Sequence, residues 1–391
     1  MTQLSKTLVV SYRQPDYSEV WMDRMTNMLR PNVEAVYALK GRSAVVGSRE
    51  ITETYLLSGF ISRLPARLAV GVGRRIINRE MSRVLELHSP ETTVLVHYLT
   101  MAVGIREAIQ NCQNPVFVHC HGFDVTWNRK NERMPFLPDH FPSYVRRVQE
   151  LSKRVRFIAN SNATAEKLRD IGIADQRISV KYIGAPIPSD FRPLPASANG
   201  ITILFLGRLM DFKGPVETIQ AFAKARQLGL KGRLIIAGGG HQRSACVGEI
   251  QKHGIAEYVD LLGPVPATRA RELMSQASIF TAHNQRSSRT GQEEAFGVSV
   301  IEAMACGVPV VTGRSGGVCE TVVDGETGFL FKPGDIEAHA AALLRLANDK
   351  NLRDTLGSNG HQRACRLFSL EEEQRRLREI LFSQSPGSFS E

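Results

Sequence analysis

Short apolar runs alternate with stretches of helical periodicity along most of this chain. Runs with the length and composition of strands lie at 7–11, 115–120, 157–161, 180–184, 201–206, 234–237, 258–265, 279–282 and 308–311. After Gly214, by contrast, Val216, Ile219 and Phe222 follow the spacing of one helix face. Because strands that alternate with helices favour parallel sheets covered on both faces, the predicted fold class is α/β.

One stretch interrupts this alternation. Residues 184–200 hold four prolines and little periodicity, which is typical of a linker between domains. A chain of 391 residues is long enough for two or three domains with their own cores. The sequence therefore predicts domains at 1–190 and 198–368, then a last helix at about 371–382 and a loose tail at 383–391.

The densest candidate chemistry lies between 292 and 335. Glu294 and Glu302 flank the turn Phe296-Gly297 and the start of an amphipathic helix that includes Val298. A helix that begins after a glycine turn offers backbone N–H groups and the positive end of its dipole to an anion. A carboxylate on each side of such a site can hold hydroxyl groups, so the pattern suits a sugar nucleotide.

A second candidate element follows the apolar run 201–206. Arg208 stands at the predicted strand end and Lys213 at the start of the next helix. A forked guanidinium and a compact ammonium are both suited to phosphate. The alternative is that both are ordinary surface cations on a loop. The motif at 292–335 follows in the expected order along the chain and favours the phosphate role.

The stretch 292–335 resembles the signature of the retaining glycosyltransferases of family 4, the glycosyltransferase-1 domain, whose two glutamates are separated by seven residues. The resemblance implies the GT-B fold, with two Rossmann-like domains facing each other across a cleft. It implies that 198–368 binds the nucleotide-sugar donor and that 1–190, completed by the helix at 371–382, shapes the acceptor side. It also places Val265 near the nucleobase.

The run at 115–120 leads into His121-Gly122-Phe123-Asp124. In the family that this chain resembles, such a turn faces the cleft, which implies that His121 approaches the donor sugar and that Asp124 lies beside the acceptor. The alternative for His121 is a core histidine. We interpret His119, two positions earlier on the same strand face, as structural, and the role of His283 stays open.

The resemblance implies sugar transfer from a UDP- or GDP-linked donor to a hydroxyl acceptor, with retention at the anomeric carbon and with no further cofactor. The residues assigned to catalysis are His121, Arg208, Lys213 and Glu294. Those assigned to the donor are Arg208, Lys213, Val265, Glu294, Phe296, Gly297, Val298 and Glu302. Polysaccharide, glycolipid or lipid-linked glycan synthesis would use such an enzyme. A nucleotide-sugar-binding partner without transfer activity, a transferase for a soluble small molecule and an epimerase of the same fold are the alternatives.

No metal ligands are assigned. The chain contains no Asp-x-Asp and no His, Cys or carboxylate cluster at the spacing of metal ligands. We therefore expect the two cations and the helix amides near Phe296 to carry the charge of the departing diphosphate, without a metal ion.

The net charge of +10 is unevenly distributed. Residues 1–190 hold 26 Lys/Arg and 18 Asp/Glu, so 26 − 18 = +8, and the remainder gives 23 − 21 = +2. Six arginines face a single glutamate, Glu80, in one part of the first domain: Arg63, Arg67, Arg74, Arg75, Arg79 and Arg83. Arg75, Arg79 and Arg83 recur every four residues, opposite Ile77 and Met81, so they form an arginine stripe on a predicted amphipathic helix. The stripe is either a solvated helix face or a surface for an anionic membrane or acceptor. No recognition fold accompanies it, so we expect no nucleic-acid partner.

Composition and cysteine use are those of an ordinary globular protein, with 42% hydrophobic and 23% charged residues. No apolar run reaches the length of a membrane helix, and the first residues lack the apolar segment of a secretory signal. The six cysteines show no C-x-x-C pairing, which indicates reduced, buried thiols. We expect a cytoplasmic protein, in which peripheral contact with the inner face of the membrane is compatible with the arginine stripe.

Overall fold

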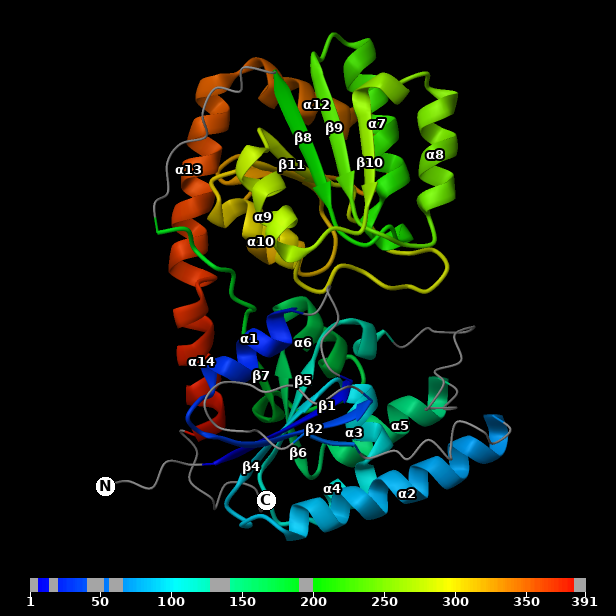
Figure 1. The fold of residues 1–391 in the computed structure, drawn as a ribbon, viewed down its shortest axis with the longest axis vertical. Coiled ribbons are helices and arrows are strands. Elements are labelled where there is room, and N and C mark those ends of the chain that lie inside the picture. Colours follow the sequence, from blue (N-terminus) through cyan, green and yellow to red (C-terminus); the bar gives the residue numbers. More distant parts are fainter. Residues whose placement is uncertain are drawn as a thin grey trace. The chain divides into compact units, whose positions relative to one another are not determined.

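The computed structural model describes residues 6–13, 20–40, 53–55, 66–126, 141–189 and 200–382. Contacts divide the chain into two compact units (Figure 1), Met1–Lys181 with Gln374–Glu391, and Tyr182–Glu373. The proline-rich linker at 190–199, the tail at 383–391 and Arg63 lie outside the described residues, as do the side chains of Arg67 and Arg74.

The first unit is built on a seven-stranded parallel sheet with the order β3-β2-β1-β4-β5-β6-β7. Its strands are β1 (Thr7–Arg13), β2 (Val33–Lys40), β3 (Glu53–Tyr55), β4 (Thr93–His97), β5 (Val116–Cys120), β6 (Val155–Ala159) and β7 (Ile178–Val180). Its helices are α1 (Val20–Met28), α2 (Ala66–Glu86), α3 (Leu99–Gly104), α4 (Arg106–Asn111), α5 (Phe141–Leu151), α6 (Asn162–Arg169) and, from Gln374 on, α14 (Leu370–Phe382), with short 3₁₀ turns η2 (Phe123–Val125) and η3 (Asp175–Arg177).

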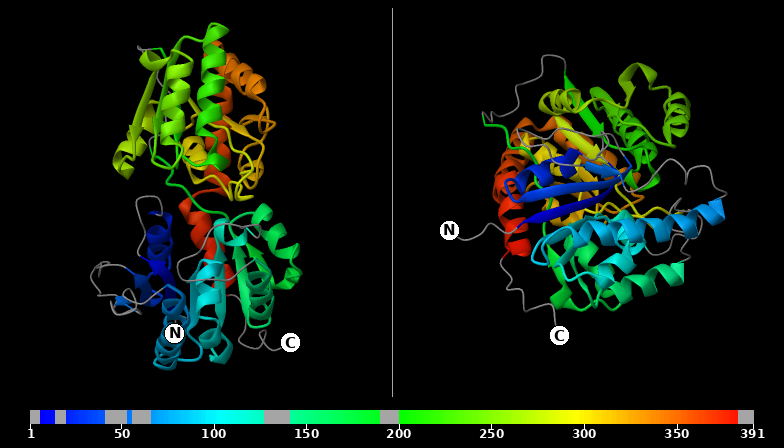
Figure 2. Two further views of the ribbon diagram at one scale, coloured as in Figure 1. Left: turned by 90° about the vertical axis from the view of Figure 1, so that its right-hand side faces the viewer. Right: turned by 60° about the horizontal axis from the view of Figure 1, so that its bottom comes forward.

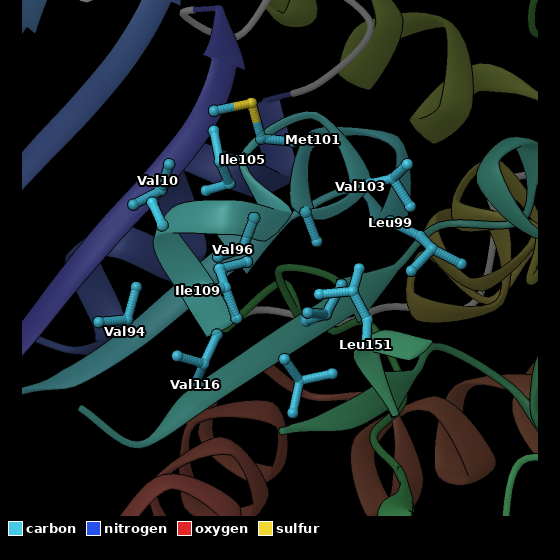
Figure 3. Close-up of a cluster of buried hydrophobic side chains, with 14 of the residues drawn as sticks. Val10, Val94, Val96, Leu99, Met101, Val103, Ile105, Ile109, Val116 and Leu151 are labelled. Carbon is cyan, nitrogen blue, oxygen red and sulfur yellow. The ribbon is translucent and has the colours of Figure 1, made fainter. Parts of the chain in front are cut away.

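Alternate residues of each central strand feed two different cores. Val94, Val96 and Val116 pack with Met101 and Ile109 of α3 and α4 on one face, as Figure 3 shows. Leu95 and Phe117, which alternate with these valines along β4 and β5, belong to a second cluster on the other face. That cluster, to which α1 and α14 contribute, contains Met25, Leu29, Leu95, Phe117, Ile158, Leu377, Ile380 and Leu381. Because strand side chains alternate between faces, near-continuous apolar strands are what a sheet buried on both sides requires.

The second unit holds a six-stranded parallel sheet with the order β10-β9-β8-β11-β12-β13. Its strands are β8 (Ile201–Leu206), β9 (Gly232–Ala237), β10 (Val259–Gly263), β11 (Ile279–Ala282), β12 (Val310–Gly313) and β13 (Gly328–Phe331). Its helices are α7 (Pro215–Gln227), α8 (Arg243–Lys252), α9 (Ala267–Gln276), α10 (Val298–Ala305), α11 (Val318–Thr321), α12 (Ile336–Asn348) and α13 (Lys350–Leu367), with 3₁₀ turns η4 (Asp211–Lys213) and η5 (Ala256–Tyr258). Helices cover both faces of each sheet (Figure 2), so the predicted α/β fold class is confirmed.

The passage between the units falls earlier than the sequence indicated. The run 180–184 is not a strand, because β7 ends at Val180 and Tyr182 stacks on Phe296 of the second unit. Gly184 then donates its N–H to the carboxylate of Glu373 (2.8 Å). These contacts assign residues from Tyr182 onward to the second unit, whereas the prolines of the linker had suggested a boundary near 190.

The cysteine prediction needs one correction. All six cysteines lie in the described part of the chain and are free thiols. Cys319 and Cys365, however, are exposed rather than buried. Helical position decides this, since both stand on the outer faces of α11 and α13.

Helix α2 carries the described part of the arginine stripe. Arg75, Arg79 and Arg83 are exposed, while Ile77 and Met81 between them are buried. Arg83 is paired with Glu80 (2.8 Å). The amphipathic pattern predicted for this helix is therefore present, and no helix among the described residues is long and apolar enough to cross a membrane.

Candidate functional site

The second unit has its topological switch point between β8 and β11. In the sheet order β9 lies on one side of β8 and β11 on the other, so the chain leaves their carboxyl ends in opposite directions. Ligands of open parallel sheets bind at such a point. Arg208 and Lys213 follow β8, and Glu294 follows β11, so residues that are about eighty positions apart in the sequence meet there.

Lys213 and Glu294 form an ion pair, with side chains only 14% and 11% exposed. The Glu294 carboxylate also accepts the N–H of Gly297 (3.1 Å). Burial alone would raise the pKa of Glu294, but the charge and hydrogen bond of Lys213, the charge of Arg208 and the N–H of Phe296 together lower it below its usual value. Glu294 is therefore an anion held between cations at neutral pH.

Phe212 gives the two cations a common apolar platform. Its ring is buried, and the guanidinium carbon of Arg208 lies 5.7 Å from the ring centroid. The ammonium nitrogen of Lys213 lies 5.9 Å from the same centroid. Arg208 is exposed, so its fork is open to a ligand while the ring limits its directions.

The turn η4, which carries Lys213, is fastened to the loop that leads from β11 to Glu294. The N–H of Gln285 donates to the carbonyl of Phe212 (3.0 Å). The side-chain amide of Gln285 donates to the carbonyl of Asp211 (3.0 Å) and to the carboxylate of Glu217 (2.8 Å). The hydroxyl of Ser287 donates to the carboxylate of Asp211. Sequence reasoning missed these positioning residues, because no local spacing signals a contact across some seventy residues.

Helix α10 begins at Val298, directly after Gly297, which has a φ of 86°. The N–H groups of Phe296 and Gly297 already bond the Glu294 carboxylate, and that of Val300 donates to the carbonyl of Gly297 (2.9 Å), so the helix amides left for a diphosphate are those of Val298 and Ser299. The expectation that they begin at Phe296 is therefore corrected by two residues. The ring of Phe296 is 1% exposed, stacks on Tyr182 at 5.3 Å between centroids, and belongs to the packing rather than to a ligand surface.

The backbone at Gly316-Gly317 packs closely against that of Glu294 and so fixes its position. Gly317 donates its N–H to the carbonyl of Glu294 (2.9 Å). A Cβ on Gly316, whose φ is 57°, would lie 2.1 Å from that same carbonyl oxygen. Only glycine fits there.

Glu302 and Val265 are less closely tied to this centre. Glu302 is half-buried in α10. The burial of the Cys306 thiol and, after it, the negative charge of Glu302 raise the pKa of Cys306 to about 11. Val265 is half-buried in the loop after β10, an edge strand two positions away from β8. The ribose and nucleobase roles assigned to them stay predictions.

In the first unit, His121 follows β5 and is half-buried. Its Nε2 lies 3.4 Å from Nδ1 of His97, and its ring lies 4.6 Å from that of Tyr98. Asp124 is 2% exposed and accepts the N–H groups of His121 (2.8 Å) and Leu99 (2.7 Å). Asp124 therefore fixes the backbone of this turn, and its expected place beside the acceptor stays a prediction.

Tyr98 is a second residue that the sequence did not indicate. Its φ of 70° makes it the one non-glycine residue with positive φ in the described part of the chain. Such strain is concentrated at functional sites, and Tyr98 stands at the end of β4, at the switch point of the first sheet between β1 and β4.

His119 and His121 are not alone, because β4 and β5 bring His97 beside them. Burial lowers the pKa of all three imidazoles, with further lowering by the charge of Lys181, and that of His97 falls to about 3. The rings are neutral at neutral pH. Sequence spacing indicated no such cluster, since His97 and His119 meet only through strand pairing.

His283 has a structural role. Its Nε2 accepts the N–H of Gly334 (2.8 Å), so its Nδ1–H donates to Nδ1 of His339 (3.0 Å). The Nε2–H of His339 then donates to Thr281 (2.7 Å), whose hydroxyl donates to the carbonyl of Val311 (2.9 Å). One proton arrangement satisfies the whole buried chain, and it needs both rings neutral.

Comparison with known families places a match in the second unit. Residues 187–363 match the family described as Glycosyl transferases group 1. The match includes Arg208, Lys213, Glu294 and Glu302.

Individual relatives agree with this class. The capsular polysaccharide biosynthesis glycosyltransferase CapM of Staphylococcus aureus is 30% identical over 174 residues, 44% of this chain and 43% of the relative. The GDP-mannose-dependent α-(1-6)-phosphatidylinositol monomannoside mannosyltransferase of Mycolicibacterium smegmatis is 31% identical over 179 residues, 46% and 47% of the two chains. The matches thus span less than half the length of these relatives.

A solved structure extends the likeness in fold to the first unit. Anabaena Alr3699/HepE in complex with UDP superposes with a TM-score of 0.75 at 21% identity, over 97% of this chain and 100% of that one. The chain therefore has the fold implied by the sequence resemblance, with two Rossmann-like α/β domains of the GT-B class.

Proposed function

We propose that this protein is a metal-independent, retaining glycosyltransferase that moves a sugar from a nucleotide-diphosphate sugar to a hydroxyl acceptor. The observation that carries the proposal is the meeting of Arg208, Lys213 and the buried Glu294 at the switch point of a glycosyltransferase group 1 domain. An anionic carboxylate next to two cations matches a ligand that presents hydroxyl groups at one end and a diphosphate at the other.

Arg208 and Lys213 stabilise the diphosphate as it leaves. In the transfer the bond from the anomeric carbon to the diphosphate oxygen breaks and a bond to the acceptor oxygen forms on the same side. The acceptor's proton passes to the diphosphate oxygen. Charge develops on the leaving group, so the cations and the first amides of α10, those of Val298 and Ser299, contribute most in the transition state.

Glu294 then holds sugar hydroxyls, and Glu302 holds the ribose. Lys213 stays bonded to Glu294 and offers its other N–H donors to phosphate, so the carboxylate fixes the ammonium before the donor arrives. Neutral His121 donates or accepts a hydrogen bond at the sugar end without adding charge.

The acceptor is an anionic or membrane-held glycan or lipid, such as those used in polysaccharide, glycolipid or lipid-linked glycan synthesis. Support comes from the exposed arginines of α2, Arg75, Arg79 and Arg83, and from the polysaccharide and phosphatidylinositol relatives. The protein would then work in the cytoplasm, peripherally on the inner face of the membrane. Flotation with anionic but not neutral liposomes is expected, and equal lack of binding to both at low salt indicates a soluble acceptor.

The donor is tested with UDP-, GDP-, ADP- and TDP-sugars. A ligand that binds only the folded state raises the melting temperature, and an active transferase slowly hydrolyses its donor. Binding without any hydrolysis or transfer would favour the alternative, a nucleotide-sugar-binding partner protein. Turnover should persist in excess chelator, and a loss that magnesium restores would contradict the metal-independent mechanism.

The cation roles are tested with Arg208→Ala and Lys213→Ala. Losing one charge that acts on the leaving group typically costs about a hundredfold or more in turnover. Arg233→Ala is the matched control, because Arg233 sits near the start of β9, is half-exposed, and bonds only Asp260 and the carbonyl of Glu257 in the contacts described. Near-normal turnover of both site variants would refute the phosphate role.

A further inference from the structure

Three histidines of the first unit lie on one patch of the sheet. His97 is the last residue of β4 and pairs in register with His119 of the parallel strand β5. His121 follows two residues later, so its side chain points to the same face as that of His119. This is the face of Leu95 and Phe117, which pack with α1 and α14. Strand pairing therefore sets the spacing of His97 and His119, and His121 joins them from the turn that directly follows β5.

The spacing fits a single metal ion. One ring nitrogen from each histidine lies within 4.8 Å of the others. For a tetrahedral ion with Zn–N bonds of about 2.0–2.1 Å, two ligand nitrogens are about 3.4 Å apart and two ring centroids about 5 Å. The measured centroid distances are 4.2, 5.6 and 5.7 Å, and Nδ1 of His97 lies 3.4 Å from Nε2 of His121. Small side-chain rotations bring the third nitrogen into place.

The surroundings decide which ion fits. The three ligands are imidazoles, which suit Zn²⁺, Co²⁺ or Ni²⁺ and not the oxygen-seeking Mg²⁺ or Ca²⁺. Two buried charges flank them, the ammonium of Lys181 and the carboxylate of Asp124, which bonds the N–H of His121. The two charges have opposite sign, and Lys181 is the one whose charge lowers the pKa of all three imidazoles, so the metal competes with its repulsion. His97 and His119 are buried and His121 is half-buried, so the side of His121 is the least covered one.

We propose that His97, His119 and His121 form a binding site for one Zn²⁺-class transition-metal ion, with a fourth position open to water on the side of His121. The ion replaces the 3.4 Å contact between His97 and His121. Binding does not depend on the transferase activity. One consequence does rest on the proposed function: an ion that holds His121 removes it from the donor sugar, so Zn²⁺ inhibits transfer.

The test uses the tag-free full chain and Co²⁺ as a spectroscopic stand-in for Zn²⁺. Titration should produce the intense visible bands of tetrahedral Co²⁺, saturating at one ion per chain, and Zn²⁺ should displace them. Mg²⁺ should have no effect. Absence of tetrahedral bands in the wild-type protein at micromolar concentration would overturn the proposal.

Variants locate the ion. His119→Gln should abolish the bands, and His121→Ala, at a half-exposed position, is the second variant if the first does not fold. The control is Cys365→Ser, because exposed Cys365 lies 3.4 Å from His361 and forms a competing two-ligand surface pair. Bands that survive in both histidine variants, or that vanish in Cys365→Ser, would place the ion elsewhere and refute the site.

The inhibition is measured separately. Zn²⁺ should lower the rate of transfer or donor hydrolysis at the concentration that fills the Co²⁺-competed site, and a chelator should restore it. Co²⁺ binding with unchanged turnover would leave the metal site standing and remove His121 from the transfer mechanism. Absence of any turnover without metal would count against the proposed function instead.

Discussion

The ion pair between Lys213 and Glu294 makes a stability prediction that does not depend on any substrate. Lys213→Met keeps most of the volume of the side chain but leaves the carboxylate of Glu294 in a site where its side chain is only 11% exposed. Removing one partner of a buried pair costs about 3–5 kcal/mol, because the other charge stays desolvated. Arg208 and the N–H of Gly297 still favour the anion, so we expect the lower end, about 3 kcal/mol. For a unit of this size that corresponds to a fall of about 6–12 °C in melting temperature.

The dependence on pH distinguishes this cause from a simple packing defect. In the wild type the pKa of Glu294 is lowered, so its contribution to stability is present above the unfolded pKa and is lost as pH falls through the folded one. Desolvation is the largest influence on the pKa of Glu294 and raises it. In Lys213→Met the charge and hydrogen bond that oppose this effect are gone, so the pKa of Glu294 rises. The difference in unfolding free energy between the two proteins should therefore be largest near neutral pH and shrink towards about pH 4.

Scanning calorimetry and urea unfolding followed by circular dichroism measure both effects. Glu294→Gln in the Lys213→Met background removes the charge and keeps an oxygen for Gly297, so it should recover most of the loss. Lys252→Met is the matched control, because its ion pair with Glu249 is exposed on the lysine side (66%) and should contribute about 1 kcal/mol or less. A loss in Lys213→Met that is independent of pH and that Glu294→Gln does not relieve would refute the reasoning.

Three further changes test other parts of the structure. Burial lowers the pKa of His283 to about 4 and holds that of His339 well below its usual value, so the unfolded chain binds more protons below about pH 6.5. As the pH is lowered from about 6.5 to 4, the free energy of unfolding should fall by about 1.4 kcal/mol per pH unit for each ring. A urea midpoint that stays flat over this range would contradict this. Gly316→Ala drives a Cβ to 2.1 Å from a carbonyl oxygen and should weaken donor binding in a thermal-shift assay, whereas Gly325→Ala, with φ +76° and open space, should show only its backbone strain of about 1–2 kcal/mol. Asp124→Asn can accept only one of two buried N–H groups, so urea unfolding should show a loss of about 1–3 kcal/mol, and an unchanged midpoint would argue against its role in fixing the turn.

Local sequence pattern was sufficient for many of the strands and for the order of the motifs, although β2, β4 and β13 were not among the predicted runs and the run 180–184 is not a strand. Ile201–Leu206 is an apolar run that forms β8 with the same bounds, and the turn at Gly297 begins α10 as its glycine predicts. Parallel strands with opposite exits at a switch point then bring Arg208 and Glu294 together, because the chemistry of such sheets lies at their carboxyl ends.

What the sequence could not show depends on register and on distant contacts. Gln285 bonds the turn of Lys213 across 74 positions, and His97 meets His119 only because β4 pairs with β5 in one register. Both are products of sheet order, which no short-range spacing encodes. The same holds for the packing of Phe296, a residue that the resemblance assigned to the donor and whose ring stacks on Tyr182.

The helix α14 links the two ends of the sequence and has a consequence for synthesis. Leu377, Ile380 and Leu381 supply part of the cluster that covers Leu95 and Phe117 on the first sheet. Until these late residues leave the ribosome, one face of that sheet is covered only in part, by α1 with Met25 and Leu29, although its strands were made long before. The second unit, contiguous from Tyr182 to Glu373, can complete its core earlier. We therefore expect the usual order of domain folding during translation to be inverted, with the amino-terminal unit the last to become protease-resistant.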